Sequence, residues 1–157
     1  MIQFQAIGHA ETPYSDIANM PIQGAGLTDN QGRLVIAPQY AKGLDDLHEF
    51  SHIYVLFHLH RSQPGALKVT PFLDTVERGI FATRSPKRPN PIGLSIVAID
   101  RIVDNVIHVR GIDLLDGTPI IDVKPYIQAF DNIPATRDGW YERGMKPTET
   151  LSDRRFG

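Results

Sequence analysis

Residues 95–112, SIVAIDRIVDNVIHVRGI, predict a β-hairpin. Two runs rich in β-branched residues are joined by Asp104 and Asn105, which tolerate the left-handed backbone of a tight turn. Further strands are predicted wherever apolar residues follow a strand-like pattern. These segments are Phe4–Ala10, Leu34–Ile36, His52–His60, Gly79–Thr83 and Ile120–Val123. We therefore expect a mainly β protein.

Helical patterning is confined to residues 43–50, so the alternating βαβ units of a doubly wound sheet are missing. Short antiparallel strands must pack as a sandwich or close into a barrel to remove their exposed edges. We favour a single compact antiparallel or mixed β-barrel of about seven strands with one or two short helices. Residues 127–157 lose the alternation and predict an irregular C-terminal arm with one short helix near Ala135–Tyr141. Residues 1–157 then form one domain.

The composition excludes several classes of protein. The chain contains no Cys, so it has no disulfide, thiolate nucleophile or zinc knuckle. Its formal net charge of -2 argues against a protein that coats nucleic acid by gross electrostatics, and any RNA contact must be local. No apolar run is long enough to span a bilayer, and the N-terminus lacks a basic segment followed by an apolar core. We expect a cytoplasmic protein with no membrane partner.

Residues 79–95, GIFATRSPKRPNPIGLS, predict a strand that runs into a rigid cationic loop. Its three prolines restrict the backbone, so Arg84, Lys87 and Arg88 lose less entropy when they bind an anion. A guanidinium can grip a carboxylate or a phosphate with two parallel hydrogen bonds. The alternative interpretation is a solvated basic loop whose prolines only prevent strand pairing. Composition alone leaves both interpretations open.

Residues 114–126, LLDGTPIIDVKPY, predict an Asp-Gly turn followed by a strand. Asp116 can accept hydrogen bonds from an amine or a ribose, and Gly117 allows a ligand to approach the backbone closely. Along the strand, Asp122 and Lys124 are expected on one face, with Ile121 and Val123 on the other. An ordinary hairpin turn followed by a surface ion pair is the alternative.

The strand His52–His60 places His52, His58 and His60 on one face together with Tyr54 and Leu56. Imidazoles at alternate strand positions can converge on a metal ion, but the strand contains no carboxylate to complete a ligand set. We favour a polar lining of a ligand pocket, or hydrogen-bonded histidines of the barrel, and predict no metal site.

Near the N-terminus, PIQGAGL (21–27) lacks the following helix of a dinucleotide-binding loop, although its glycines can form one wall of a small-ligand site.

Three stretches together, FSHIYVLFHLHR, GIFATRSPKRPNPIGLS and DLLDGTPIIDVKPY, resemble the TsaA-like family, also called YaeB, VirR or TrmO-like proteins. The resemblance covers nearly the whole chain. It implies a β-barrel methyltransferase fold that binds S-adenosylmethionine near a homodimer interface. It also implies methylation of the N6 nitrogen of N6-threonylcarbamoyladenosine beside the anticodon of tRNA.

Motif matches assign the site residues. Cofactor contacts fall on Gln23, Gly24, His60, Arg61, Arg84, Leu94, Asp116, Gly117, Thr118 and Pro119. A base or a polarising contact is expected among Asp122, Lys124, Tyr126 and His52, because the carbamoyl group makes N6 a poor nucleophile. Lys87 and Arg88 are expected to hold the tRNA backbone or the threonyl carboxylate.

Three other functions compete with this interpretation. The first is a module that binds S-adenosylmethionine or a nucleotide for regulation, without catalysis. The second is a metal-dependent enzyme built on the histidine face of the strand 52–60. The third is methylation of a small molecule or a protein, which the same cofactor pocket would serve.

Overall fold

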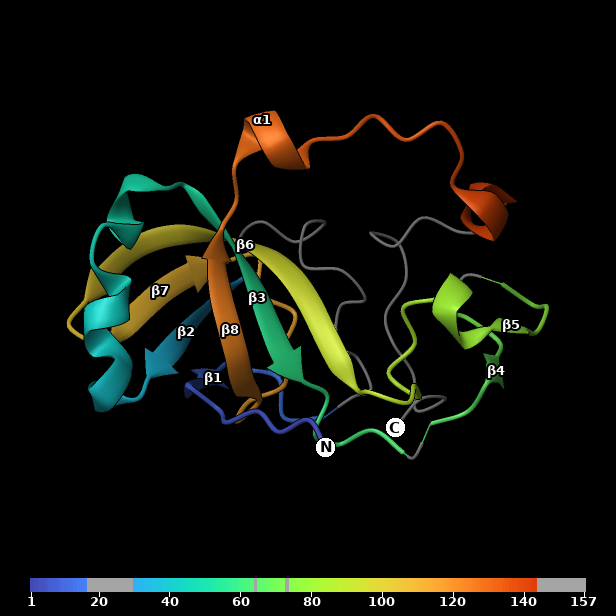
Figure 1. Cartoon of the computed structure of the whole chain (residues 1–157), viewed down its shortest axis with the longest axis horizontal. Helices are drawn as coiled ribbons and strands as arrows, with labels where there is room; N and C mark the ends of the chain where they lie inside the picture. The colour runs from blue at the N-terminus through green and yellow to red at the C-terminus, as the bar shows by residue number, and fades with distance from the viewer. Residues whose placement is uncertain (17–29, 64, 73, 144–157) are drawn as a thin grey trace.

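The computed structural model describes residues 1–16, 30–63, 65–72 and 74–143. Six antiparallel strands close into a barrel in the order β1-β2-β7-β6-β3-β8, with β8 returning to β1 (Figure 1). The strands are β1 (Gly8–Glu11), β2 (Gln31–Ile36), β3 (His52–His58), β6 (Ile92–Val103), β7 (Val106–Arg110) and β8 (Pro119–Pro125). The predicted mainly β barrel is thus confirmed, with six strands in the barrel instead of about seven.

Alternate residues of these strands point inward and form one core. On β3, Ile53 and Val55 are fully buried while His52 and His58 are exposed, as the two-residue period predicts. The β6–β7 hairpin has the predicted tight turn, with Asp104 at a φ of 54°. Asn105 anchors this turn because its Nδ2 donates to the carbonyl of Ile36, 2.7 Å away.

Strand β8 differs from its predicted alternation. Its pairing with β3 shifts between Leu56 and Phe57, so that Val123 and Ile120 both face the core, although they are three residues apart. Ile121 is left half-buried outside the core, and the prediction that it shares a face with Val123 is wrong. The extra residue of a β-bulge explains the difference, because it breaks the two-residue period.

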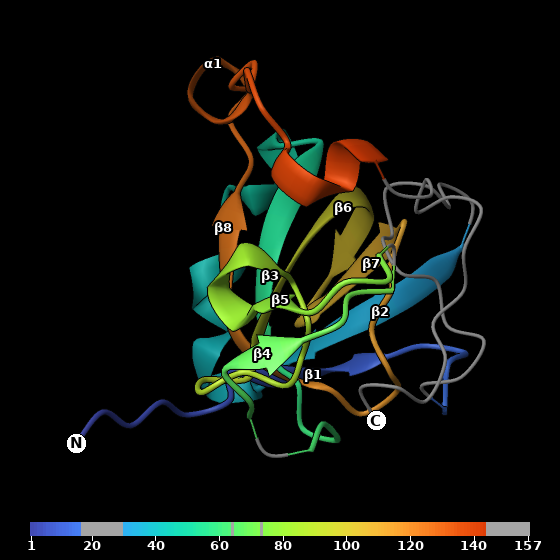
Figure 2. The same ribbon diagram turned by 90° about the vertical axis from the view of Figure 1, so that its right-hand side faces the viewer.

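The residues between β3 and β6 form a separate lobe beside the barrel. It holds the two-stranded sheet of β4 (Lys68–Val69) and β5 (Arg78–Gly79), as Figure 2 shows. The predicted strand Gly79–Thr83 is wrong beyond Gly79, because residues 80–82 form the 3-10 helix η4 (Ile80–Ala82). The hydroxyl of Thr83 donates to the Ile80 carbonyl at 2.9 Å and holds this turn.

Helices are few and short. The predicted helical segment 43–50 is divided between the 3-10 helices η2 (Pro38–Leu44) and η3 (Leu47–Glu49), because Asp46 adopts a left-handed φ of 70° between them. In the C-terminal arm, α1 (Gln128–Asp131) and η5 (Gly139–Arg143) replace the single helix predicted at 135–141. The arm reaches the lobe, where Trp140 Nε1 donates to the Ala82 carbonyl at 2.7 Å. Within the described ranges, no helix is long and apolar enough to cross a bilayer.

Candidate functional site

The outer face of β8, β3 and β6 brings two predicted groups of site residues together. Leu56 pairs with Asp122 on one side and with Leu94 on the other. Adjacent strands lie about 4.8 Å apart, so the backbones of Leu94 and Asp122 are only about 10 Å apart across Leu56. Leu94 is 59% exposed, which makes it an apolar surface next to a carboxylate. A predicted cofactor contact and a predicted catalytic residue therefore share one row.

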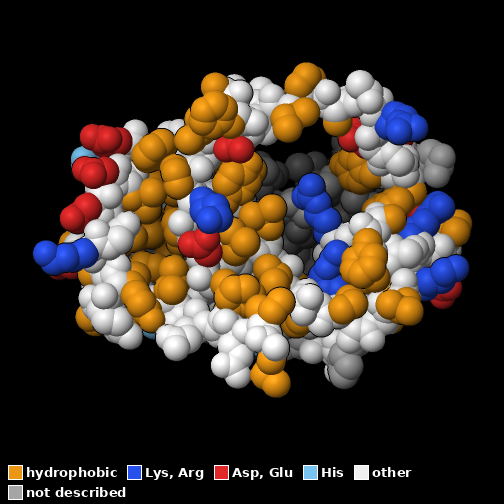
Figure 3. Space-filling model, viewed as in Figure 1, with side chains coloured by type: hydrophobic (Ala, Val, Ile, Leu, Met, Phe, Trp, Pro, Cys, Tyr) orange, Lys and Arg blue, Asp and Glu red, His pale blue; other side chains and the backbone are white. Residues whose placement is uncertain are grey.

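The next row of the same face contains Lys124, Tyr54 and Ile96. Lys124 Nζ lies 2.8 Å from Asp122 Oδ2, so these two side chains share a face as predicted. The Lys124 side chain is 63% exposed and the Asp122 side chain 43% exposed, so the ion pair contributes little stability. In Figure 3, hydrophobic side chains gather over this half of the barrel around one basic and one acidic group.

A third row contains the other two predicted catalytic residues. His52 pairs with Ala98, and Tyr126 N donates to the His52 carbonyl at 3.0 Å. The His52 and Tyr126 rings meet edge to face at 6.4 Å. His52 stands four residues from Leu56 along β3, which corresponds to about 13 Å. Asp122 and Lys124 are consequently much nearer to Leu94 than His52 is.

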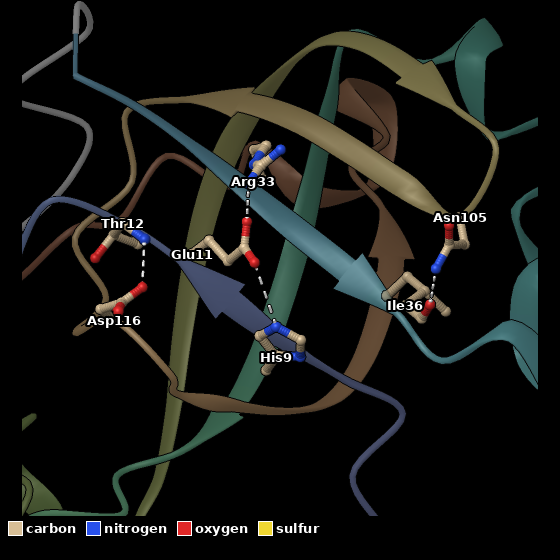
Figure 4. Close-up of polar contacts among 7 residues, drawn as sticks. All are labelled: His9, Glu11, Thr12, Arg33, Ile36, Asn105 and Asp116. Carbon is tan, nitrogen blue, oxygen red and sulfur yellow. Dashed lines mark hydrogen bonds and ion pairs between the residues drawn. The ribbon is translucent and has the colours of Figure 1, made fainter.

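The predicted Asp-Gly turn lies at the end of the barrel where β3 stops and β8 starts. Gly117 has a φ of 81°, and nothing lies within 4 Å of the position of a Cβ, so the turn is open on one side. Asp116 N donates to the Tyr14 carbonyl at 2.6 Å, and Asp116 Oδ1 accepts from Thr12 N at 3.0 Å (Figure 4). Thr118 is buried and bonds its hydroxyl to the Leu115 carbonyl at 2.6 Å, and Pro119 begins β8.

Arg61 belongs to the same end of the barrel. Its Nη1 donates to the carbonyl of Ser15 at 2.7 Å, one residue from the Tyr14 carbonyl that holds Asp116. The segment 14–15 thus connects the predicted cofactor residues Arg61 and Asp116. His60, beside Arg61, has a lowered pKa because desolvation outweighs the opposite effect of a hydrogen bond with the His58 backbone, and the charges of His58 and Arg61 lower it slightly further.

The proline-braced loop is internally fixed. Arg88 Nη1 donates to the carbonyls of Thr83 and Ser85, at 3.0 and 3.1 Å. Thr83 and Ser85 are buried, whereas Arg84 between them is exposed. Within the described part of the chain, the Arg84 side chain has no hydrogen-bond or ion-pair partner. Arg88 thus stabilises the conformation of this loop, while the Arg84 guanidinium is available to bind a ligand.

Two backbone hydrogen bonds tie this loop to the segment that follows β3, the first of them directly at the strand end. Leu59 N donates to the Pro91 carbonyl at 2.8 Å, and Ala66 N donates to the Lys87 carbonyl at 3.3 Å. The loop therefore returns to the barrel at the end that holds the Asp116 turn. The described contacts include none between Arg84 and Asp116, and their joint contact with one ligand stays a prediction. Lys87 lines a pocket of about 530 Å³ with Lys68, Thr70 and Thr75 on the lobe.

Figure 3 shows a hollow between the barrel and the lobe, with Lys or Arg side chains along its border.

Gln23 and Gly24, the other predicted cofactor contacts, lie outside the described residues. In the ranges that the structure describes, no three His, Asp or Glu side chains are grouped to hold a metal ion. The His58 and His60 rings are 6.5 Å apart between centroids.

Tyr54 is the residue that motif matching left out of the site. Its ring lies 5.6 Å from that of Tyr126, and its row places it between Lys124 and Ile96. The two-residue period of β3 already assigned Tyr54 to the face of His52. Its position relative to β8 depends on non-local pairing, which the sequence pattern does not contain.

Comparisons with known proteins agree with these motifs. A family model described as the tRNA-methyltransferase O N-terminal domain matches residues 9–132. A probable S-adenosyl-L-methionine-binding protein of Pyrococcus abyssi is 39% identical over 153 residues, which are 98% of this chain and 83% of that protein. The tRNA (adenine(37)-N6)-methyltransferase of Escherichia coli is 39% identical over 142 residues, covering 84% of this chain and 60% of the enzyme. The crystal structure of TrmO from Pseudomonas aeruginosa superposes with a TM-score of 0.75 at 30% identity, over 89% of this chain and 62% of that one.

Proposed function

Because this chain belongs to the tRNA-methyltransferase O N-terminal domain family, we propose that it is an S-adenosylmethionine-dependent methyltransferase that modifies an adenine N6 in tRNA. The observation that carries the proposal is the row formed by Leu94, Leu56 and Asp122, near the Asp116 turn and Arg61. This row sets an apolar surface for a cofactor beside a carboxylate that can receive a proton.

The residues present fit S-adenosylmethionine chemically. Its carboxylate needs a cation, and the Arg84 guanidinium is exposed and without a partner among the described residues. Its ammonium and ribose need acceptors, and the open turn at Asp116 offers a carboxylate and backbone carbonyls. Its adenine needs an apolar surface such as the exposed Leu94. When bound, the cofactor supplies an electrophilic methyl group on its sulfonium.

The protein itself must orient the acceptor nitrogen and remove its proton. We infer that Asp122 is the base, because it is the predicted catalytic carboxylate nearest to Leu94. Its Oδ1 accepts from Val123 N at 2.9 Å and its Oδ2 faces Lys124, so the carboxylate is held in one orientation. The N6 proton passes to Asp122 and then to water, since the carboxylate is partly exposed.

We propose N6-threonylcarbamoyladenosine beside the anticodon as the specific substrate. The threonyl group adds a carboxylate next to N6, and Lys87 on the rigid loop is the cation that we assign to that carboxylate or to a backbone phosphate. Arg88 contributes to substrate binding indirectly, because its two hydrogen bonds maintain the conformation of this loop. The family resemblance also implies a homodimer, which we include in this proposal. Action on tRNA implies a cytoplasmic protein.

A second candidate is S-adenosylmethionine binding without methyl transfer. The chain spans only about 60% of the Escherichia coli enzyme, whereas the Pyrococcus relative that it covers to 83% is named only for cofactor binding. Binding of the cofactor with no transfer to any tRNA would favour this function.

The test is transfer of labelled methyl groups from S-adenosylmethionine to tRNA that carries N6-threonylcarbamoyladenosine, followed by mass spectrometry of the nucleosides. We expect the methylated nucleoside with the wild-type protein and at least a hundred-fold lower rate with Asp122→Asn. Asp104→Asn, a matched change at the far hairpin turn, should keep the wild-type rate. Absence of transfer by the wild-type protein to modified and unmodified tRNA would contradict the proposed activity.

A further inference from the structure

An aromatic cluster occupies the outer face of the barrel beyond the Leu94 row. Tyr54 lies on β3, and Tyr126 follows β8, with their ring centroids 5.6 Å apart at an interplanar angle of 54°. His52 meets Tyr126 from the other side at 6.4 Å. Tyr54, Tyr126 and His52 therefore form a continuous aromatic surface on the exposed side of the sheet, which we call the aromatic platform.

The platform is held rigidly. Tyr54 is half-buried, and the Asp131 carboxylate lies near its phenol. Asp131 is itself fixed, because its Oδ2 accepts from Ile127 N at 2.8 Å at the start of α1. Desolvation and the charge of Asp131 raise the pKa of Tyr54. Rigid rings lose little entropy when a flat ligand stacks on them.

The charges around the platform indicate the kind of ligand. Lys124 stands in the same row as Tyr54, and Asp122, its ion-pair partner, belongs to the next row toward Leu94. An aromatic ring with a cation beside it is the usual surface for single-stranded nucleic acid, because every base has a π-face and every nucleotide carries a phosphate. Ile96, 40% exposed, adds apolar surface opposite Tyr54, and two carboxylates also lie nearby: Asp131 beside the Tyr54 phenol and Asp122 in its ion pair with Lys124.

The platform also lies close to the row that contains Asp122, the proposed base. Tyr54 is two residues from Leu56 along β3, a step of about 7 Å, and its side chain points to the same face. A base stacked on Tyr54 would therefore be close to an adenine whose N6 lies beside Asp122, without overlapping it.

We propose that Tyr54, supported by Tyr126, stacks a nucleobase of the RNA next to the adenine that is methylated. This inference rests on the proposed function and names a substrate contact of the same site. The occupant is an unpaired base of an anticodon loop, whose loop bases are free to leave their neighbours and stack on protein.

The test measures RNA affinity by fluorescence anisotropy, with a labelled 17-nucleotide anticodon stem–loop as the probe. Tyr54→Leu keeps apolar bulk but removes the ring, and we expect its RNA affinity to fall about 5- to 150-fold, the range for loss of one base–aromatic stack. Tyr54→Phe keeps the ring and should bind RNA within about two-fold of wild type. Tyr40→Leu, a partly exposed tyrosine on η2, is the matched control and should leave RNA affinity unchanged.

Further readouts separate the possible outcomes. Calorimetric affinity for S-adenosylmethionine should be unchanged in Tyr54→Leu, and the loss in methyl transfer should appear in KM more than in kcat. Wild-type RNA affinity in Tyr54→Leu would overturn the inference even if methyl transfer is observed, in which case the proposed function stands. If the wild-type protein transfers no methyl group, the proposed function fails and the RNA affinities still decide the inference. A lower molar mass of Tyr54→Leu by light scattering, with unchanged RNA affinity per subunit, would identify the platform as a subunit contact instead.

Discussion

Leu94 and Asp122 face the same side of the barrel, separated only by Leu56 on the strand between them. They are 28 residues apart in the sequence and belong to different motifs, yet the β6-β3-β8 pairing aligns them. Leu94 would contact the bound cofactor, and Asp122 would receive the proton of an acceptor nitrogen placed beside it. This alignment has consequences that can be measured.

Leu94 should contribute to cofactor affinity through its exposed side chain. Leu94→Ala removes apolar surface that the cofactor would cover, and we expect affinity for S-adenosylmethionine to fall about five- to ten-fold, corresponding to about 1–1.5 kcal/mol. Isothermal titration calorimetry measures the change. Val103→Ala, at the far end of the same strand and 48% exposed in the wild-type protein, should bind the cofactor normally. Equal affinities for the two variants would remove Leu94 from the site.

Arg84 should contribute strongly to cofactor affinity, although its side chain is exposed. Its guanidinium projects from a loop fixed by Arg88 and has no partner among the described residues, which suits a contact with an anion. Arg84→Ala should lose at least ten-fold in cofactor affinity, and Arg84→Lys should recover part of it, because a lysine supplies the charge but not the paired hydrogen bonds. Arg101→Ala, an exposed arginine elsewhere on β6, is the control. Unchanged calorimetric affinity in Arg84→Ala would refute the assignment.

Arg88 should act through the loop instead of through direct contact with the cofactor. Arg88→Ala deletes two hydrogen bonds to the Thr83 and Ser85 carbonyls, and we expect the free energy of unfolding to fall by about 1–3 kcal/mol. Urea denaturation measures this loss. A variant with wild-type stability but weakened RNA binding would instead make Arg88 a direct RNA contact.

The sequence predicted the parts of this fold that depend on local pattern. Strands β3 and β6 and the turn at Asp104 were foreseeable, because β-branched residues and turn residues act over a few positions. The bulge at Ile121 and the 3-10 turn at residues 80–82 were not, since each depends on contacts formed only after folding. The motifs likewise supplied Leu94 and Asp122 but not their alignment, which requires the register of three strands.

Gly93 tests the packing beneath the site. A Cβ built on Gly93 would lie 2.3 Å from the Phe57 ring, which fills the barrel at this point. Gly93→Ala should therefore destabilise the protein by about 1–3 kcal/mol, since a well-packed core resists added volume. Gly79→Ala, where nothing lies within 4 Å, should change the free energy of unfolding by less than about 0.5 kcal/mol. Similar thermal midpoints for both variants would contradict this packing.

Histidine protonation should make the barrel less stable in mild acid. The pKa of His108 is lowered by desolvation and by the charges of Arg101 and Arg33, against a smaller opposite effect of Asp100. The unfolded chain then binds a proton at His108 more tightly than the folded chain does. The free energy of unfolding is therefore unaffected by His108 above about pH 6.5 and falls as the pH drops below that value. His60 shifts in the same direction. Urea midpoints at pH 7.5 and 5.5 should therefore differ less in His108→Gln than in the wild-type protein. Arg101→Ala should raise the pKa of His108 and also reduce the difference, whereas an unchanged difference in both variants would show that other groups set the acid sensitivity.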